Sequence, residues 1–212
     1  MLSAMHIQKL YDTQDHSRMI GCLAQNGTAL PLPLQAKLTQ SAAAIGLGLR
    51  RLSELIYGQT SLSVAMTNSL IQNQLPDGAF PGTVDNDPLT TAAATTGLAA
   101  ILREQQAVPD QGLTNALDRA LIALTAMQDA EGLFRHSDDR TEEDRALTSA
   151  FVLFLLARLP RFRESIRFAE LMTWFDERAD RLDEDTAQLY HMASLDDPAH
   201  QTYSPAMDAI AA

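Results

Sequence analysis

A short pattern occurs twice in this chain, and it limits the possible folds more than any other feature. Residues 74–80 read QLPDGAF and residues 128–134 read QDAEGLF, so both copies have Gln, three residues, Gly, one residue and Phe. Self-similarity at a fixed period of some tens of residues is typical of repeat architectures. The chain is therefore expected to contain successive copies of one supersecondary unit.

The repeat extends beyond the pattern in both directions. A shift of 54 residues aligns the two copies, and a shift of 51 finds a weaker copy upstream, in which Gly27 meets Gly78 and Gly46 meets Gly97. We predict one domain over residues 1–195 and an irregular tail over 196–212. The predicted units cover residues 12–57, 61–105, 111–160 and, in degenerate form, 162–195.

Each clear unit predicts two helices of different character. Residues 112–128 place leucines at helical spacing on one face, which is typical of an amphipathic outer helix. Residues 92–102 and 150–157 are apolar or small on all sides, which is typical of a buried inner helix. No segment alternates with the period of a strand. The predicted fold class is all-α, with helical hairpins in two layers.

Charge and cysteine content exclude several classes of protein. Sixteen basic residues face 27 acidic ones, and the net charge of −11 disfavours nucleic acids and anionic membrane surfaces as partners. The single cysteine, Cys22, cannot form an internal disulfide and is expected to be a small buried side chain. There is no signal-peptide pattern and no apolar run long enough for a membrane span, so we expect a cytoplasmic protein.

With a leucine four residues before each glutamine, the pattern resembles the QW motif of squalene and terpene cyclases and related repeats of protein prenyltransferase β subunits. Phe stands where that family usually has Trp. The resemblance implies an α/α toroid, here a partial one, because the chain is too short for a closed ring. It also implies a structural role, in which the Gln bonds toward a neighbouring helix end and the aromatic ring stacks over it. The matching residues are Leu70, Gln74, Gly78, Phe80, Leu124, Gln128, Gly132 and Phe134.

Acidic side chains are concentrated in the loops that lead from outer to inner helices, at residues 76–88 and 129–144. Alternation of outer and inner helices places these loops at one end of the assembly. The DxDD acid motif of squalene-type cyclases is incomplete in both DNDP and SDDR. We expect the loop acids to be exposed, without the raised pKa that a proton donor needs. The weak catalytic candidates are Asp85, Asp87, Asp138 and Asp139.

The same acids have a structural interpretation. Asp87, which precedes a proline, is typical of a helix N-cap, and Thr141 with Asp144 resembles a capping box. His136 with Asp138 offers only two metal ligands on one loop. We therefore expect neither a metal site nor a cofactor.

Two further groups of residues suggest binding surfaces. Small residues on the inner helices leave room for an apolar or isoprenoid molecule, although close packing of the helices is the alternative. Arginines after the last inner helix are candidates to pair with the acidic loops of a second copy in a homodimer. The cavity candidates are Thr91, Thr95, Phe151 and Phe154, and the arginines are Arg158, Arg161, Arg163 and Arg167.

The sequence favours a non-catalytic binding or scaffold module of the prenyltransferase and squalene-cyclase repeat type, which holds a protein partner or an apolar small molecule. The alternative is a small terpene-cyclase-like or prenyltransferase-like enzyme that acts on an isoprenoid through the loop acids. A third interpretation is a plain helical bundle with coincidental repeats. The incomplete acid motif, the missing ligands and the short chain favour the first.

Overall fold

The computed structural model describes residues 3–21, 30–55, 60–85, 87–104 and 110–194. Within these ranges the chain forms eleven helices and no strand, which confirms the predicted all-α class. No helix in this part of the chain is long and apolar enough to cross a membrane. The predictions for Cys22, Gly27 and the tail at 196–212 lie outside the described residues.

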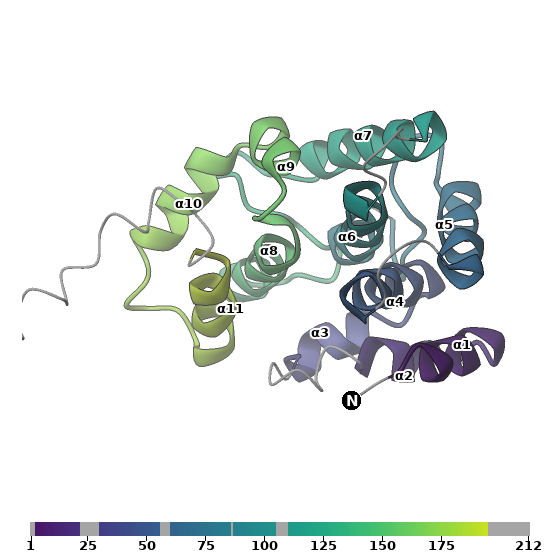
Figure 1. Ribbon diagram of the computed structural model, residues 1–212. Helices are drawn as coiled ribbons and strands as arrows, with labels where there is room; N and C mark the ends of the chain where they lie inside the picture. The colour runs from purple at the N-terminus through teal and green to yellow at the C-terminus, as the bar shows by residue number, and fades with distance from the viewer. Residues whose placement is uncertain (1–2, 22–29, 56–59, 86, 105–109, 195–212) are drawn as a thin grey trace, which may run out of the picture.

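Four helices form an inner row, and the others surround it (Figure 1). The inner helices α4, α6, α8 and α11 contact one another in that order. The inner helices cover Ser41–Leu55, Pro88–Glu104, Glu142–Leu156 and Glu184–Ser194. The surrounding helices are α1 (Ala4–Asp12), α2 (His16–Gly21), α3 (Leu32–Lys37), α5 (Ser61–Asn73), α7 (Gln111–Ala126), α9 (Pro160–Ser165) and α10 (Phe168–Asp176).

Burial distinguishes the two kinds of helix. In α7 the buried leucines recur along one face, and the polar residues between them are exposed or half-buried. In α6 nearly every residue from Pro88 to Ile101 is buried, because α4, α7 and α8 cover its different sides. The short helix α3 begins at Leu32, where Pro31 and Pro33 suit the first turn of a helix.

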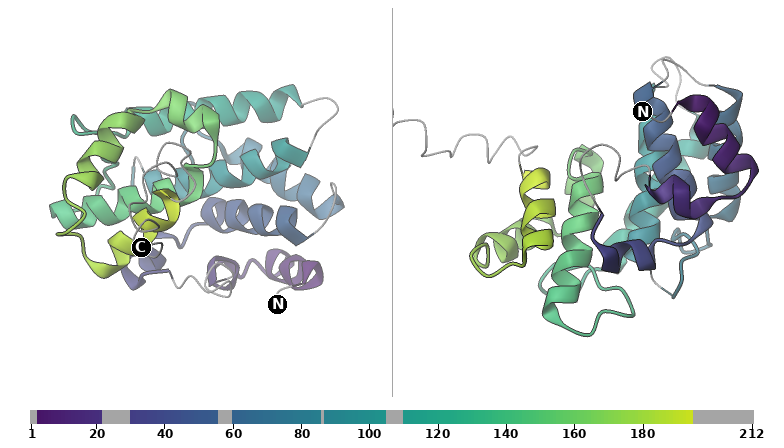
Figure 2. Two further views of the ribbon diagram at one scale, coloured as in Figure 1. Left: turned by 60° about the vertical axis from the view of Figure 1, so that its left-hand side comes forward. Right: turned by 90° about the horizontal axis from the view of Figure 1, so that it is seen from below.

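The units follow one another across the molecule. Figure 2 shows α1 and α2 at one side and α10 and α11 at the other. Helices α9, α10 and α11 occupy the region predicted as a degenerate fourth unit, and α11 packs on α8. The partial toroid that the family resemblance implies stays a prediction.

The two central inner helices touch backbone to backbone. A Cβ added to Gly46 would overlap the carbonyl of Ala93, and one added to Gly97 would lie 2.6 Å from the carbonyl oxygen of Gly46. Only glycine permits this approach of α4 to α6. Gly46 and Gly97 occupy equivalent positions in the repeat, so the sequence match identifies the crossing point of the helices.

Because of this contact, we expect alanine substitutions at two glycines of α4 to have different effects on stability. Gly46→Ala should lower the free energy of unfolding by about 1–3 kcal/mol or more, because backbone atoms must move apart. Gly48→Ala is the matched control, since its Cβ would meet only the terminal methyl groups of Met19 and Met66. These side chains can shift, and alanine favours the helix by up to about 1 kcal/mol. Urea denaturation measures both, and equal losses would contradict the assignment.

Candidate functional site

The first copy of the repeated pattern connects the loop after α5 to helix α7. The Gln74 amide donates to the carbonyl oxygens of Gly78 and Ala116, both at 2.8 Å, and its own oxygen accepts from the Arg119 guanidinium. Gly78 has a φ of +93°, which L side chains rarely adopt, and a Cβ there would overlap the carbonyl of Arg119. The loop is therefore fixed against the middle of the next outer helix.

The second copy makes the corresponding connection to α10. The Gln128 amide donates to the Gly132 carbonyl at 2.6 Å, and its oxygen accepts from the backbone N–H of Arg167 at 2.9 Å. Arg167 is the N-cap of α10, so this Gln satisfies a backbone group at a helix end. Gly132 also has a positive φ, of +85°. Gln74 differs, because it bonds within α7 and not at its end.

The aromatic residues of the pattern point into the core. Phe80 and Phe134 are fully buried, and their backbone N–H groups donate to Thr91 Oγ1 at 3.2 Å and Ser149 Oγ at 2.8 Å. These acceptors belong to the inner helices α6 and α8. The Phe134 ring stacks on Phe162 of α9, with a centroid distance of 6.3 Å. All six residues of the pattern thus act between helices.

Two of the four candidate acids are buried, and the expectation that these loop acids are exposed is wrong for them. Asp87 is 1 % exposed and Asp139 is 8 % exposed. The Asp87 carboxylate accepts from the backbone N–H and the hydroxyl of Thr90, at 2.9 and 2.7 Å, which confirms its capping role at α6.

Asp139 forms a buried ion pair that joins distant parts of the chain. Its Oδ1 lies 2.6 Å from Lys37 Nζ and 3.2 Å from the Thr148 hydroxyl, and its Oδ2 accepts from the backbone N–H of His136 at 2.9 Å. Lys37 ends α3, whereas Thr148 belongs to α8. The pair therefore fastens the loop before α8 to the segment before α4.

The other two acids are at the surface. The Asp138 side chain is 62 % exposed, and the Asp85 backbone carbonyl accepts from Ser137 Oγ at 2.8 Å. Neither is joined to a cluster of ligands, since no group of three or more His, Cys, Asp or Glu side chains in the described residues is arranged to hold a metal ion. The four candidates are thus divided between two buried structural carboxylates and two peripheral residues.

The sequence indicated His136 only as one of two possible metal ligands, whereas its side chain is fully buried in the structure. Its Nδ1 accepts from the backbone N–H of Asp138 at 3.2 Å, so the ring hydrogen is assigned to Nε2. Nε2 is buried, has no hydrogen-bond partner among the described residues, and lies 3.8 Å from Asp87 Oδ1. The imidazole thus faces the Asp87 carboxylate that caps α6, and both side chains are buried.

Removal of the buried carboxylate should be costly. Asp139→Asn leaves Lys37 without its counter-ion and is expected to lower the free energy of unfolding by about 3–5 kcal/mol. Asp138→Asn is the matched control, because this exposed neighbour should change stability by no more than about 0.5 kcal/mol. Chemical denaturation at pH 7 compares them, and a loss below 1 kcal/mol for Asp139→Asn would remove its assigned role.

The capping box at α8 gives a pH-dependent prediction. The Thr141 side chain accepts from the backbone N–H of Asp144, and Asp144 accepts from the backbone N–H groups of Thr141 and Arg140. The hydrogen bond from Arg140 is the main cause that lowers the pKa of Asp144. Since the folded pKa is depressed, the carboxylate stabilises the fold at neutral pH, and this contribution is lost as the pH falls through the folded pKa.

Asp144→Asn should therefore reduce the free energy of unfolding at pH 7 by at most about 1 kcal/mol, because the group is partly solvated. The difference from the wild type should begin to shrink as the pH falls below about 4, the ordinary value for Asp, and should vanish only below the lower folded pKa. Denaturation curves between pH 7 and pH 3 measure it, with Glu143→Gln in the same turn as control. A difference that persists at low pH would show that the charge is not responsible.

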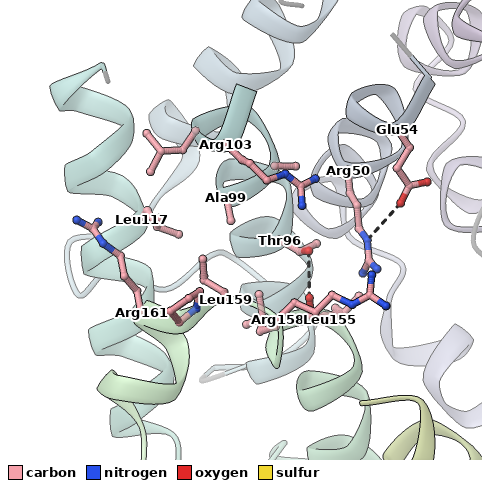
Figure 3. Close-up of a pocket in the computed structure, with 14 residues that line it drawn as sticks. Arg50, Glu54, Thr96, Ala99, Arg103, Leu117, Leu155, Arg158, Leu159 and Arg161 are labelled. Carbon is pink, nitrogen blue, oxygen red and sulfur yellow. Dashed lines mark hydrogen bonds and ion pairs between the residues drawn. The ribbon is translucent and has the colours of Figure 1, made fainter. Parts of the chain in front are cut away.

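The pocket of interest lies at the opposite end of the inner helices. It has a volume of about 470 Å³ and opens between the C-terminal ends of α4, α6 and α8, with walls from α7 and α9 (Figure 3). Eight apolar residues line it: Ala99, Ala100, Leu102, Leu117, Leu155, Leu156, Leu159 and Pro160. This volume is in the range of small-molecule sites, roughly 300–1,000 Å³.

The polar lining of this pocket is predominantly basic. It consists of Thr96, Glu54, Arg50, Arg103, Arg158 and Arg161. The Thr96 hydroxyl donates to the Leu155 carbonyl at 3.3 Å, and Arg50 lies over the Phe154 ring at 5.6 Å. These arginines could have been noticed in the sequence, because an arginine lies near the C-terminal end of each inner helix that borders the pocket: Arg50 in α4, Arg103 in α6 and Arg158 after α8.

The predicted cavity residues lie elsewhere. The residues that line this pocket, as far as the chain is described, do not include Thr91, Thr95, Phe151 or Phe154. Thr91 and Thr95 are buried, and the Thr95 hydroxyl donates to the Thr91 carbonyl within α6. Phe151 and Phe154 pack on each other, with centroids 6.3 Å apart. Thr91 and Thr95 thus serve close packing of the inner helices, the alternative that the sequence left open.

All four arginines predicted to meet a second copy have interactions within the chain. Arg161 pairs with Asp118 at 2.8 Å, Arg163 donates to the Ala157 carbonyl, and Arg167 donates to the Ala130 carbonyl. Arg158 belongs to the pocket. The predicted homodimer stays a prediction.

Comparison of the chain with protein-family models, curated proteins and solved structures found no match. The resemblance to the QW-motif family therefore stays a prediction that rests on the repeated pattern. Functional conclusions for this chain depend on its own geometry.

Proposed function

We propose that this protein is a non-catalytic binding module of helical-hairpin type that holds an apolar small molecule. The observation that carries the proposal is the pocket at the C-terminal ends of α4, α6 and α8, with its apolar lining from α6, α7, α8 and the start of α9. Pockets of this kind, mainly apolar with a few polar groups, are the usual sites of small ligands. A protein partner, the other occupant favoured by the sequence, is less well matched to a concave site.

The alternative, an enzyme that acts on an isoprenoid through the loop acids, has less support. Asp87 and Asp139 are engaged by Thr90 and Lys37, and they lie at the opposite end of the inner helices from the pocket. A proton donor must be within hydrogen-bond reach of the bound molecule. A ligand in this pocket would be distant from every candidate acid.

Pocket filling tests the proposal. Ala99 is half-buried and lines the pocket, so Ala99→Trp should occupy its volume without disturbing the core. Ala65→Trp, on the exposed face of α5, is the matched control. The neutral fluorescent probe N-phenyl-1-naphthylamine should bind the wild type and Ala65→Trp saturably, with affinity reduced about tenfold or more in Ala99→Trp, the loss given by about 1.4 kcal/mol.

Two results would contradict the proposal. One is the absence of saturable binding to the wild type. The other is equal affinity for Ala99→Trp and Ala65→Trp, which would place the probe elsewhere on the surface.

A further inference from the structure

Gln14 has a backbone conformation that usually belongs to glycine. Its φ is +53°, and within the described ranges it is the one residue other than glycine with a positive φ. The Gln14 N–H donates to the Tyr11 carbonyl oxygen at 3.0 Å, at the end of α1. The next N–H, of Asp15, donates to the Leu10 carbonyl oxygen at 2.9 Å. These two bonds form a Schellman motif, in which the left-handed position is typically glycine.

The turn itself does not account for a glutamine at this position. In the two repeated loops, where a positive φ is also required, the chain has Gly78 and Gly132. A side chain in the left-handed region brings its Cβ close to the following carbonyl oxygen, so Gln14 makes the turn less stable than glycine would. Residues held in such conformations occur preferentially at functional sites. The surroundings of the Gln14 side chain are therefore of interest.

Gln14 lines a second pocket, which is polar. This pocket has a volume of about 480 Å³ and lies between α1, α2, α4 and α5, on the N-terminal side of the molecule (Figure 1). It shares no lining residue with the apolar pocket, as far as the chain is described. Its volume is also in the range of small-molecule sites. Six of its lining side chains are polar and formally uncharged: Tyr11, Gln14, His16, Ser41, Ser69 and Asn73.

These side chains have hydrogen-bonding capacity that the fold does not use. Those of Tyr11, Gln14 and His16 form no hydrogen bond with any residue of the described ranges. Asn73 donates from its amide nitrogen to the Ser69 carbonyl at 2.8 Å, which leaves its amide oxygen as an acceptor. Hydroxyl, amide and imidazole groups each both donate and accept. A ligand that matches this lining should therefore carry groups that also do both.

The charge and the apolar part of the lining narrow the ligand class. Asp12 is the one formally charged lining residue, and it already accepts from Gln8 Nε2 at 2.8 Å. The pocket thus has no formally cationic side chain to hold an anion. Ile45 and the ring of Tyr11 offer apolar surface. We propose that this pocket binds a neutral polyhydroxylated ring, of the sugar or cyclic polyol class, and that Gln14 hydrogen-bonds to its hydroxyl groups. This second site is independent of the apolar pocket.

An NMR titration of the full chain tests the ligand class. D-glucose, D-galactose and myo-inositol are each added up to about 10 mM, tenfold above a dissociation constant of about 1 mM. At least one of them should cause saturable shifts of the backbone amide signals of Gln14, Ser41 and Asn73. Cyclohexanol, which has one hydroxyl group on a ring of the same size as that of myo-inositol, is the control ligand. It should bind at least about tenfold more weakly, since it forms fewer hydrogen bonds.

Two variants of Gln14 separate ligand binding from the stability of the turn. Gln14→Gly and Gln14→Ala both remove the amide and should each weaken binding by about tenfold or more. Only Gln14→Gly removes the backbone strain, and it should raise the midpoint of thermal unfolding by about 2–4 °C. A loss of affinity in this variant therefore cannot result from unfolding. Gln72→Ala, at an exposed position of α5 outside the lining, is the matched control and should bind as the wild type does.

Three results would overturn the inference. One is the absence of saturable shifts with all three polyhydroxylated compounds, and another is a set of shifts that lies outside this pocket. The third is a stable Gln14→Gly variant that binds as tightly as the wild type, which would show that the glutamine does not contact the ligand. Equal affinity for cyclohexanol would refute the proposed ligand class. None of these results affects the apolar pocket, which the fluorescent probe tests separately.

Discussion

The backbone contact between α4 and α6 at Gly46 and Gly97 is the constraint on which the rest of the structure depends. Because neither helix has a side chain at the crossing, their separation is set by main-chain atoms. The helices α5, α7 and α8 then pack on this pair, and α11 extends the row beyond α8. The repeated Gln–Gly–Phe loops hold successive units in place, since each glutamine bonds to the next surrounding helix. Packing in the centre and hydrogen bonds at the periphery thus specify one arrangement.

The two ends of the inner helices have different chemistry as a consequence of helix polarity. At the N-terminal ends, Asp87 and the Thr141 capping box satisfy backbone N–H groups, and Lys37 neutralises the buried Asp139. The buried acids at this end therefore have structural roles. At the C-terminal ends, arginines suit the exposed carbonyl groups. The apolar walls of the pocket make this end the one at which we propose that an apolar small molecule binds.

Much of the fold could be predicted from periodicity, whereas the site could not. The stripe of leucines in α7 predicted an amphipathic outer helix, and the absence of polar residues from 150–156, the C-terminal part of α8, predicted a buried one. These predictions succeeded because the pattern of apolar residues along a helix depends on the surroundings of that helix. The burial of Asp139 depends on Lys37, which is 102 residues away in the sequence, and no local sequence pattern identifies a partner at that separation. The pocket likewise combines residues from successive units. The arginines at the ends of the inner helices were a readable signal, but their convergence required the helices to be parallel and adjacent.

The central claim is that a ligand binds at the C-terminal ends of the inner helices and not at the acidic loops. Methyl NMR spectra recorded during a titration with N-phenyl-1-naphthylamine test its location directly. The account predicts saturable shifts for Leu117, Leu155 and Leu159, which line the pocket. Leu89 and Leu133, which are buried near the acidic loops, should not shift. Shifts concentrated at these two leucines, with none at the pocket, would contradict the account.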